Sequence, residues 1–162
     1  MNYDENPFGA ANDMPNEDKA AIWNMLVLRD IDAYLAADWS LVENDFIADK
    51  FMGIDGKNEQ NPSDWKMAFP SLEDYKNLWL EQALAAQKIE YAEDIRQAIH
   101  KLTNLTDIDI NQHKAIVCKK FHGTIKKADG SVDQLNWQTL YFCEKVADEW
   151  KITGFAGYLP YL

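Results

Sequence analysis

Hydrophobic and polar positions divide the chain from residue 113 to residue 158 into three runs that are rich in β-branched and aromatic residues. Turn-forming pairs separate these runs, Asp129-Gly130 after the first and Ala147-Asp148 after the second. Runs of this kind joined by two-residue turns are typical of antiparallel hairpins. The pattern therefore predicts a three-stranded antiparallel meander, which the upstream elements cover.

The turns also predict which side chains share a face of the meander. If Asp129-Gly130 forms a two-residue turn and Val146 pairs with Glu149, one face combines aromatic, hydroxyl and basic groups, as a binding pocket does. It carries Cys118, Lys120, His122, Trp137, Thr139, Tyr141, Trp150, Ile152, Gly154, Ala156 and Tyr158. The opposite face carries Val117, Phe121, Leu140, Phe142 and Phe155 among Asn136, Gln138 and Lys151. Either face can line a pocket, because a slip of one residue exchanges them.

Residues 16 to about 37 have the spacing of an amphipathic helix. Asn16 has the side chain of an N-cap, and acidic residues follow in the first turn, where they are favourable. Wound at about 100° per residue, the apolar residues fill one half of the helical wheel, namely Ile22, Trp23, Leu26, Val27, Ile31, Ala33, Tyr34 and Ala37. Asp30 falls among them, and a carboxylate in apolar surroundings needs a partner or a function. The alternative is two narrower apolar faces with Asp30 at their hydrated margin.

Three shorter segments follow this helix. Residues 41–47 have the pattern of a short amphipathic helix, and residues 48–55 that of a strand. Residues 56–70 are rich in Pro, Asn and Asp and predict a loop, although they include Trp65, Met67 and Phe69. These apolar side chains indicate either a loop that folds over the mouth of a pocket or a surface loop pinned by its own aromatics.

A further helix is predicted to begin at Ser71, because Asp74 lies three residues later and completes a capping box. Apolar residues then repeat at helical spacing as far as Ala86. Residues 89–98 fit either a helix or a strand. From residue 99 to residue 110, alternation and Thr content favour a strand.

Composition narrows the function classes. The chain has 27 acidic and 16 basic residues, a net charge of −11 that repels phosphate backbones, so we expect no nucleic-acid partner. No run approaches the roughly 20 apolar residues of a membrane span, and the polar start is unlike a signal peptide. We therefore expect a cytoplasmic protein with no membrane partner, made of a flexible arm over residues 1–14 and a single domain over residues 15–162. Its six Trp and seven Tyr residues are typical of a pocket or an interface.

The order of helices and strands resembles the nuclear transport factor 2-like (NTF2-like) superfamily, which includes ketosteroid isomerase, scytalone dehydratase and SnoaL-like polyketide cyclases. The resemblance spans residues 16 to 158 and is carried by DIDAYLAADW leading into DFIADKFMGIDG, and by the closing TLYFCEKVADEWKITGFAGYLP. It implies an α+β fold: a cone-shaped, cystatin-like roll whose curved, mixed or antiparallel sheet wraps around the long N-terminal helix. The open end of the cone would hold the ligand.

The resemblance also implies site positions. Asp30 matches the ketosteroid isomerase tyrosine that donates to the oxyanion, and Ile54 matches the position of that enzyme's base. Tyr34 matches a pocket tyrosine of scytalone dehydratase, and His100 resembles its catalytic histidine, with His122 as a counterpart of the second. Several residues of each known catalytic set are replaced, which leaves catalysis and simple binding as alternatives.

The candidate catalytic set is Asp30, His100 and Tyr34, with the first two as acid and base. The candidate ligand-binding residues are Trp23, Ile54, Trp79, His122, Trp137, Thr139 and Tyr141. Alternatively, the two sheet histidines are structural. Three functions are open: acid–base lyase, isomerase or cyclase chemistry on a small apolar or aromatic molecule, binding of such a molecule without chemistry, and an interaction module. We expect no cofactor or metal, two free cysteines, and a homodimer formed through the sheet face away from the helices.

Overall fold

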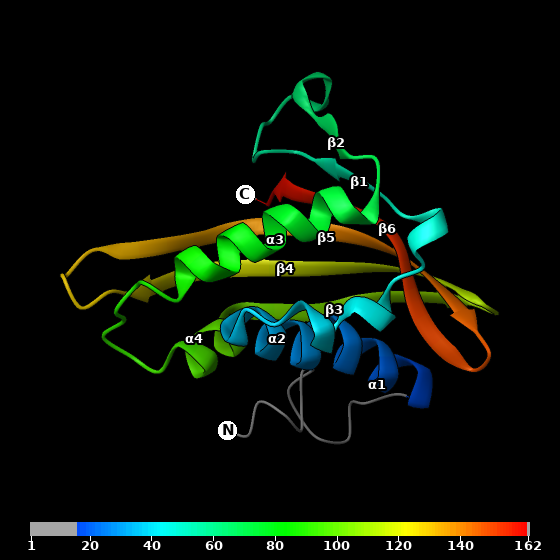
Figure 1. Cartoon of the computed structure of the whole chain (residues 1–162), viewed down its shortest axis with the longest axis horizontal. Coiled ribbons are helices and arrows are strands. Elements are labelled where there is room, and N and C mark those ends of the chain that lie inside the picture. Colours follow the sequence, from blue (N-terminus) through cyan, green and yellow to red (C-terminus); the bar gives the residue numbers. More distant parts are fainter. Residues whose placement is uncertain (1–15, 162) are drawn as a thin grey trace.

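A six-stranded sheet with helices packed on one side forms the frame of the molecule (Figure 1). The computed structural model describes residues 16–161, so the arm expected over residues 1–14 lies outside them. The strands are β1 (Met52–Asp55), β2 (Lys66–Phe69), β3 (Thr103–Asn111), β4 (Lys114–Lys126), β5 (Val132–Val146) and β6 (Glu149–Pro160). Their order is β2-β1-β6-β5-β4-β3, and all neighbours are antiparallel except β1 and β6. The α+β class, the curved mixed sheet and the meander β4–β5–β6 are thus confirmed.

The N-terminal helix is continuous but contains a widened middle turn. Its parts are α1 (Glu17–Trp23), the π-helical turn η2 (Asn24–Arg29) and α2 (Asp30–Ala36). The predicted N-cap is confirmed, since the Asn16 side chain accepts a hydrogen bond of 2.8 Å from the backbone N–H of Lys19. The helix ends where Ala37 takes a left-handed conformation, with φ of 51°. Because an extra residue enters the π-helical turn, residues on either side of it depart from a regular helical wheel.

The segment after this helix differs from the sequence prediction. Three 3₁₀ turns, η3 (Trp39–Leu41), η4 (Glu43–Asp45) and η5 (Ala48–Lys50), replace the helix expected over residues 41–47 and the first half of the strand expected over residues 48–55. The predicted loop over residues 56–70 contains the turn η6 (Pro62–Asp64) and also β2, which pairs with β1 through Gly53 and Phe69.

Two helices cover the other half of the sheet. The capping box of α3 (Leu72–Ala86) is confirmed, because Ser71 Oγ accepts from the backbone N–H of Asp74 and donates to its carboxylate. The ambiguous segment before β3 forms α4 (Ile95–Leu102), capped by the Asp94 side chain. The strand expected from residue 99 therefore begins only at Thr103, and His100 lies on a helix instead of in the sheet.

The β4–β5 register is one residue away from the prediction. The connection is a three-residue loop in which Gly130 has φ of 87° and donates to the Lys127 carbonyl, while the Lys127 N–H donates to the Ser131 carbonyl. A type I turn followed by a left-handed residue is a common three-residue hairpin loop. Phe121 consequently pairs with Trp137, and Lys119 pairs with Thr139.

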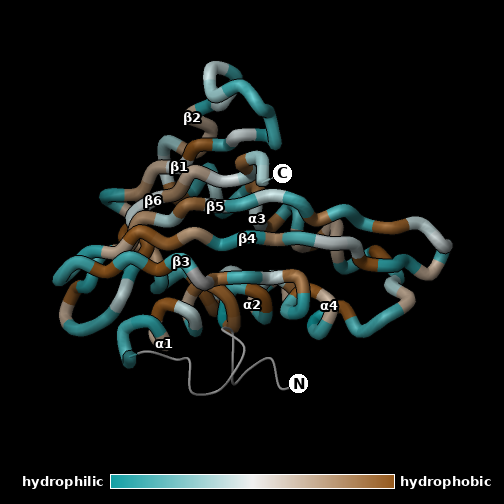
Figure 2. The backbone as a smooth tube through the Cα atoms, turned by 180° about the vertical axis from the view of Figure 1, so that it is seen from behind, coloured by the Kyte–Doolittle hydropathy of each residue, from teal (hydrophilic) through white to brown (hydrophobic). Residues whose placement is uncertain are grey.

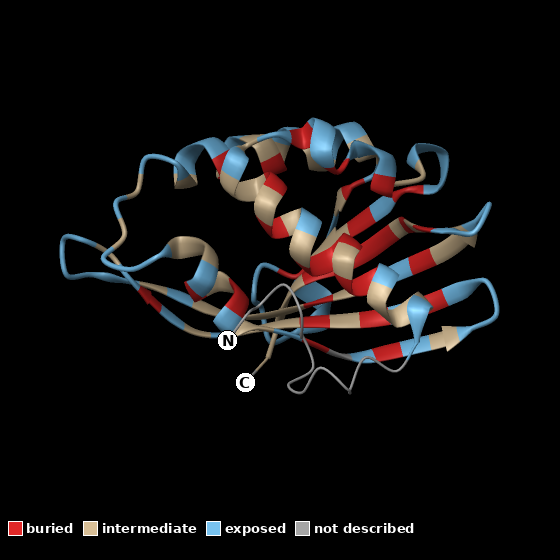
Figure 3. Ribbon diagram, turned by 90° about the horizontal axis from the view of Figure 1, so that it is seen from below, coloured by how far each residue is buried: buried red, intermediate tan, exposed pale blue. Residues whose placement is uncertain are grey.

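The register decides which face of the sheet is covered. Val117, Lys119, Thr139 and Tyr141 lie on the inner face, toward the helices, whereas Cys118, Lys120 and His122 lie on the outer face. Trp23, Leu26 and Ile31 bring the N-terminal helix into the core, where they pack with inner-face residues of the sheet. Figure 3 shows that buried positions lie both on the helices and on the strands that they cover. Seen from behind, hydrophobic stretches of the strands are interrupted by hydrophilic ones (Figure 2).

Candidate functional site

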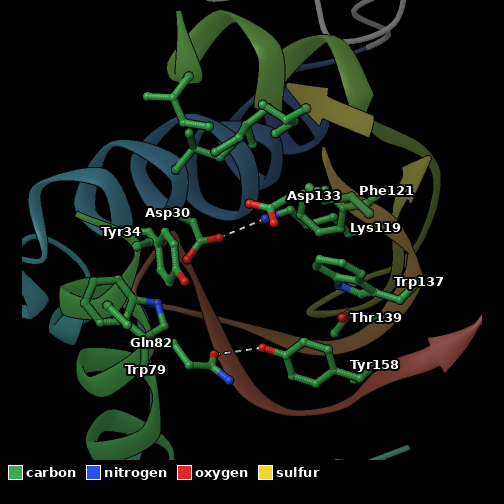
Figure 4. Close-up of a pocket in the computed structure, with 18 of the residues that line it drawn as sticks. Asp30, Tyr34, Trp79, Gln82, Lys119, Phe121, Asp133, Trp137, Thr139 and Tyr158 are labelled. Carbon is green, nitrogen blue, oxygen red and sulfur yellow. Dashed lines mark hydrogen bonds and ion pairs between the residues drawn. The ribbon is translucent and has the colours of Figure 1, made fainter. Parts of the chain in front are cut away.

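A cavity of about 510 Å³ lies between the helices and the inner face of the sheet. Figure 4 shows its polar and aromatic side chains converging from the N-terminal helix, α3 and strands β4 to β6. The lining side chains include Asp30, Tyr34, Tyr75, Trp79, Gln82, Lys119, Phe121, Trp137, Thr139, Tyr141 and Tyr158. This size and an aromatic lining with few polar groups are typical of small-molecule sites.

An ion pair between Asp30 and Lys119 lies in the cavity wall (Figure 4). Lys119 Nζ is 2.8 Å from Asp30 Oδ2, and the side chain of Lys119 is 2 % exposed while that of Asp30 is 30 % exposed. Among the described residues, the other oxygen of Asp30, Oδ1, has no hydrogen-bond partner. The carboxylate is therefore anchored through one oxygen and can accept a hydrogen bond from a ligand through the other.

The π-helical turn explains how a lysine from the sheet reaches this carboxylate. In a regular α-helix the N–H of Asp30 would donate to the Leu26 carbonyl. Here it donates to the Val27 carbonyl, and the Leu26 carbonyl accepts a hydrogen bond of 2.5 Å from Lys119 Nζ. One buried ammonium thus binds two acceptors on the same helix and fixes Asp30 at the end of the widened turn.

Tyrosine hydroxyl groups surround the carboxylate. Within residues 16–161 the hydroxyls of Tyr34 and Tyr141 have no hydrogen-bond partner, so both can bind a ligand. Burial raises the pKa of Tyr34 and raises that of Tyr141 well above the ordinary value, and the charge of Asp30 adds to both shifts. Both phenols therefore keep their protons at neutral pH and act as donors.

Tyr158 enters the cavity because of an unusual backbone conformation. Its φ is 51°, a region that a bulky residue rarely adopts and that is often associated with functional sites. The Tyr158 hydroxyl donates to Gln82 Oε1 on α3 over 3.0 Å (Figure 4). Burial raises the pKa of Tyr158 to about 12. This side chain connects the end of β6 to the helix that covers the cavity.

The structure brings together six of the predicted site residues and places the other four elsewhere. Asp30, Tyr34, Trp79, Trp137, Thr139 and Tyr141 line the cavity. Trp23 is buried in the core on α1. Ile54 lies on β1 but does not line the cavity, and it is the neighbouring residue Gly53 that packs against Phe155. His122 is exposed on the outer face beside Tyr161, as a result of the register.

His100 does not fulfil the expected role of acid or base beside Asp30. It is buried on α4, away from the lining of the cavity. The group that binds Asp30 is Lys119, which was not among the predicted site residues, because a two-residue turn grouped its neighbour Lys120 with Trp137, Thr139 and Tyr141. A three-residue loop ending in Gly130 would have predicted the position of Lys119.

Across residues 16–161 no group of three or more His, Cys, Asp or Glu side chains is arranged to hold a metal ion. In the same part of the chain, no helix combines the length and the apolarity needed to cross a membrane. Both cysteines are free thiols, and burial raises the pKa of Cys143 to about 12.

The curved sheet, the long N-terminal helix and the cavity between them define the NTF2-like fold, and solved structures confirm it. The chain is similar to an NTF2-like protein of unknown function from Pseudomonas putida KT2440, with 13 % identity, a TM-score of 0.55, and coverage of 86 % of this chain and 84 % of that one. It is also similar to a candidate ketosteroid isomerase from Shewanella frigidimarina NCIMB 400, with 19 % identity, a TM-score of 0.52, and coverage of 85 % and 94 %.

A third similar structure is a domain of unknown function with a cystatin-like fold from Nostoc punctiforme PCC 73102. It has 13 % identity, a TM-score of 0.52, and coverage of 86 % of this chain and 75 % of that one. No protein-family model and no curated protein matches the sequence. The comparisons therefore define the fold, and the function has to be argued from the cavity.

Proposed function

We propose that the cavity binds a small, largely apolar or aromatic molecule and transfers a proton to or from it, as lyases, isomerases and cyclases do. The observation that carries the proposal is the carboxylate of Asp30, which faces the cavity with one unpaired oxygen while Lys119 holds the other. The surrounding aromatic wall favours an apolar body, since it offers large rings and few charges. The similarity to a candidate ketosteroid isomerase is consistent with this class of reaction.

In the proposed mechanism Asp30 is the general base. Its free oxygen Oδ1 removes a proton from a carbon or hydroxyl of the bound molecule, and the same group returns the proton at another position. Tyr34 and Tyr141 donate hydrogen bonds to the oxygen on which negative charge develops, because both hydroxyls are available in the cavity. Lys119 holds the carboxylate in place. Both of its observed hydrogen bonds are made to the N-terminal helix, so its role is to position Asp30.

Exchange of carbon-bound hydrogen tests this chemistry without knowledge of the natural substrate. Cyclic enolisable ketones with one to three rings are incubated with the protein in deuterated water, and loss of the α-hydrogen signal is followed by nuclear magnetic resonance. We expect exchange that is faster than in buffer and that saturates with ketone concentration. Binding without exchange for every ketone would favour a ligand-binding protein that has no catalytic activity.

We further propose that the protein forms a homodimer through the outer face of the sheet. Ile116 and Phe142 are cross-strand neighbours there and are 50 % and 41 % exposed. Apolar side chains exposed side by side on a sheet favour burial against another surface. A second copy of the chain offers a face of the same composition.

Light scattering should give twice the chain mass of 18.7 kDa for the wild type. Phe142→Glu should give the monomer mass, because it places a charge in the proposed interface. Leu84→Glu, at an exposed apolar position on α3 and not on the outer face of the sheet, is the matched control and should remain dimeric. A wild-type mass of 18.7 kDa at micromolar concentration contradicts the dimer.

A further inference from the structure

The cavity has two chemically different parts. Around Asp30 its wall is aromatic and hydroxylated. Beyond Phe121 and Trp137, whose ring centroids are 5.1 Å apart, the wall becomes aliphatic. This second part, the aliphatic arm, is lined by Ile89, Ile95, Ile99, Ile125 and Leu135.

The strand register shows how far the arm extends from Asp30. Lys119, which binds Asp30, pairs with Thr139, and Ile125, six residues further along β4, pairs with Asp133. At about 3.4 Å per residue, six residues of an antiparallel strand span about 20 Å. The cavity is therefore elongated along β4 and β5.

The arm exposes apolar surface that the protein does not bury by itself. Among the described residues, Ile89, Ile95 and Leu135 belong to neither of the two hydrophobic clusters of the core and are only half-buried. Two backbone hydrogen bonds tie the segment that carries Ile89 to the β4–β5 hairpin, from Ala92 to Lys126 and from Ala128 to Glu90. These bonds fix the segment that carries Ile89 against the hairpin, so the arm is a defined part of the cavity.

Polar groups without a hydrogen-bond partner gather around Asp30, at one end of the cavity. At the Asp30 end, the described residues leave Asp30 Oδ1 and the hydroxyls of Tyr34, Thr139 and Tyr141 without partners. At the far end, Asp133 binds Tyr91 over 3.0 Å with one oxygen and Lys127 over 2.6 Å with the other. A ligand thus meets unpaired donors and an acceptor at one end, and at the other an aliphatic wall that ends at Asp133, both of whose oxygens already have partners.

We propose that the ligand is a neutral amphiphile with a single head group, namely a hydroxyl-bearing ring that carries an aliphatic chain. The ring lies between the aromatic walls, its hydroxyl donates to Asp30, and the chain occupies the aliphatic arm. A carboxylate head group is disfavoured, because it would lie against the carboxylate of Asp30 while Lys119 is already engaged. This inference names the ligand class for the proposed function and rests on it.

A series of alkylphenols tests the arm by isothermal titration calorimetry. For the wild type, Kd should fall about threefold to fourfold for each added methylene from para-ethylphenol through para-butylphenol to para-hexylphenol. Octanoate, which has an anionic head and a comparable chain, should show no saturable binding. Tight octanoate binding, or equal Kd values along the phenol series, overturns the proposal.

Substitutions inside and outside the aliphatic arm test where the aliphatic chain of the ligand binds. Ile95→Gln places an amide in the arm and should flatten the dependence on chain length while leaving the Kd of para-ethylphenol unchanged. Leu84→Gln, an exposed position on α3 outside the cavity, is the matched control and should keep the wild-type dependence. Ile95→Trp, which fills the arm instead of making it polar, should weaken only para-butylphenol and para-hexylphenol.

The two proposals fail in different ways. If no alkylphenol binds the wild type but ketones exchange, the ligand class is wrong and the proposed function stands. If no alkylphenol binds and no ketone binds or exchanges, the small-molecule function proposed for the cavity is wrong. If para-ethylphenol binds but Ile95→Gln and Leu84→Gln retain the same chain-length dependence, the cavity binds ligands and the assignment of the aliphatic arm is wrong.

Discussion

Lys119→Met should lower the free energy of unfolding by about 3 kcal/mol, measured by urea denaturation at neutral pH. Methionine fills a similar volume, but it leaves Asp30 without its cation and the Leu26 carbonyl without the donor that it has in the wild type. Removing one member of a buried ion pair costs about 3 to 5 kcal/mol. The lower end of that range applies because the cavity still hydrates the partly exposed Asp30 carboxylate.

Lys120→Met is the matched control, one residue along the same strand and on the opposite face. Lys120 pairs with Asp107 over 3.1 Å, and their side chains are 26 % and 63 % exposed. Surface ion pairs contribute roughly 0 to 1 kcal/mol, so this variant should be close to the wild type. Adding Asp30→Leu to Lys119→Met should recover most of the loss, because no charge is then left unpaired. Equal losses for Lys119→Met and Lys120→Met would contradict the buried pair.

Local signals in the sequence predicted the elements whose geometry depends on near neighbours. The cap at Asn16, the capping box of Ser71 and Asp74, and the runs of β4 to β6 each need only residues a few positions apart. Their agreement with the resemblance was enough to predict the fold class. It also placed Asp30, the one carboxylate on the apolar wheel, at the cavity.

Elements that depend on distant partners could not be predicted in the same way. β2 has four residues and becomes a strand by pairing with β1, which itself joins β6. The residues of α4 alternate in a way that favoured a strand from residue 99, and the cap at Asp94 marks the helix instead. Tertiary context overrides weak local preference in both segments.

Six of the ten predicted site residues line the cavity, and one turn explains part of what the prediction missed. A three-residue loop in place of a two-residue loop moved every β4 side chain to the opposite face. That exchange brought Lys119 and Phe121 into the cavity and moved His122 outside it. The π-helical turn, which lets Lys119 reach the Leu26 carbonyl, has no clear signature in the sequence.

Asp30→Asn should reduce hydrogen exchange in bound ketones about a hundredfold to ten-thousandfold, the usual contribution of a general base. The amide has the shape of the carboxylate and can still accept from Lys119, so the fold should be retained. A ketone has no hydroxyl to donate to Asp30, so ketone binding should be retained too. It cannot take up a proton from the ligand at neutral pH, and this difference isolates the chemical step.

Calorimetric Kd values for the ketones and exchange rates in deuterated water, measured on the same preparations, separate binding from catalysis. Asp32→Asn is the matched control, because Asp32 lies on the same helix but pairs with Arg96 outside the cavity lining. It should exchange ketones at the wild-type rate. If Asp30→Asn also exchanges them at the wild-type rate, proton transfer does not pass through Asp30.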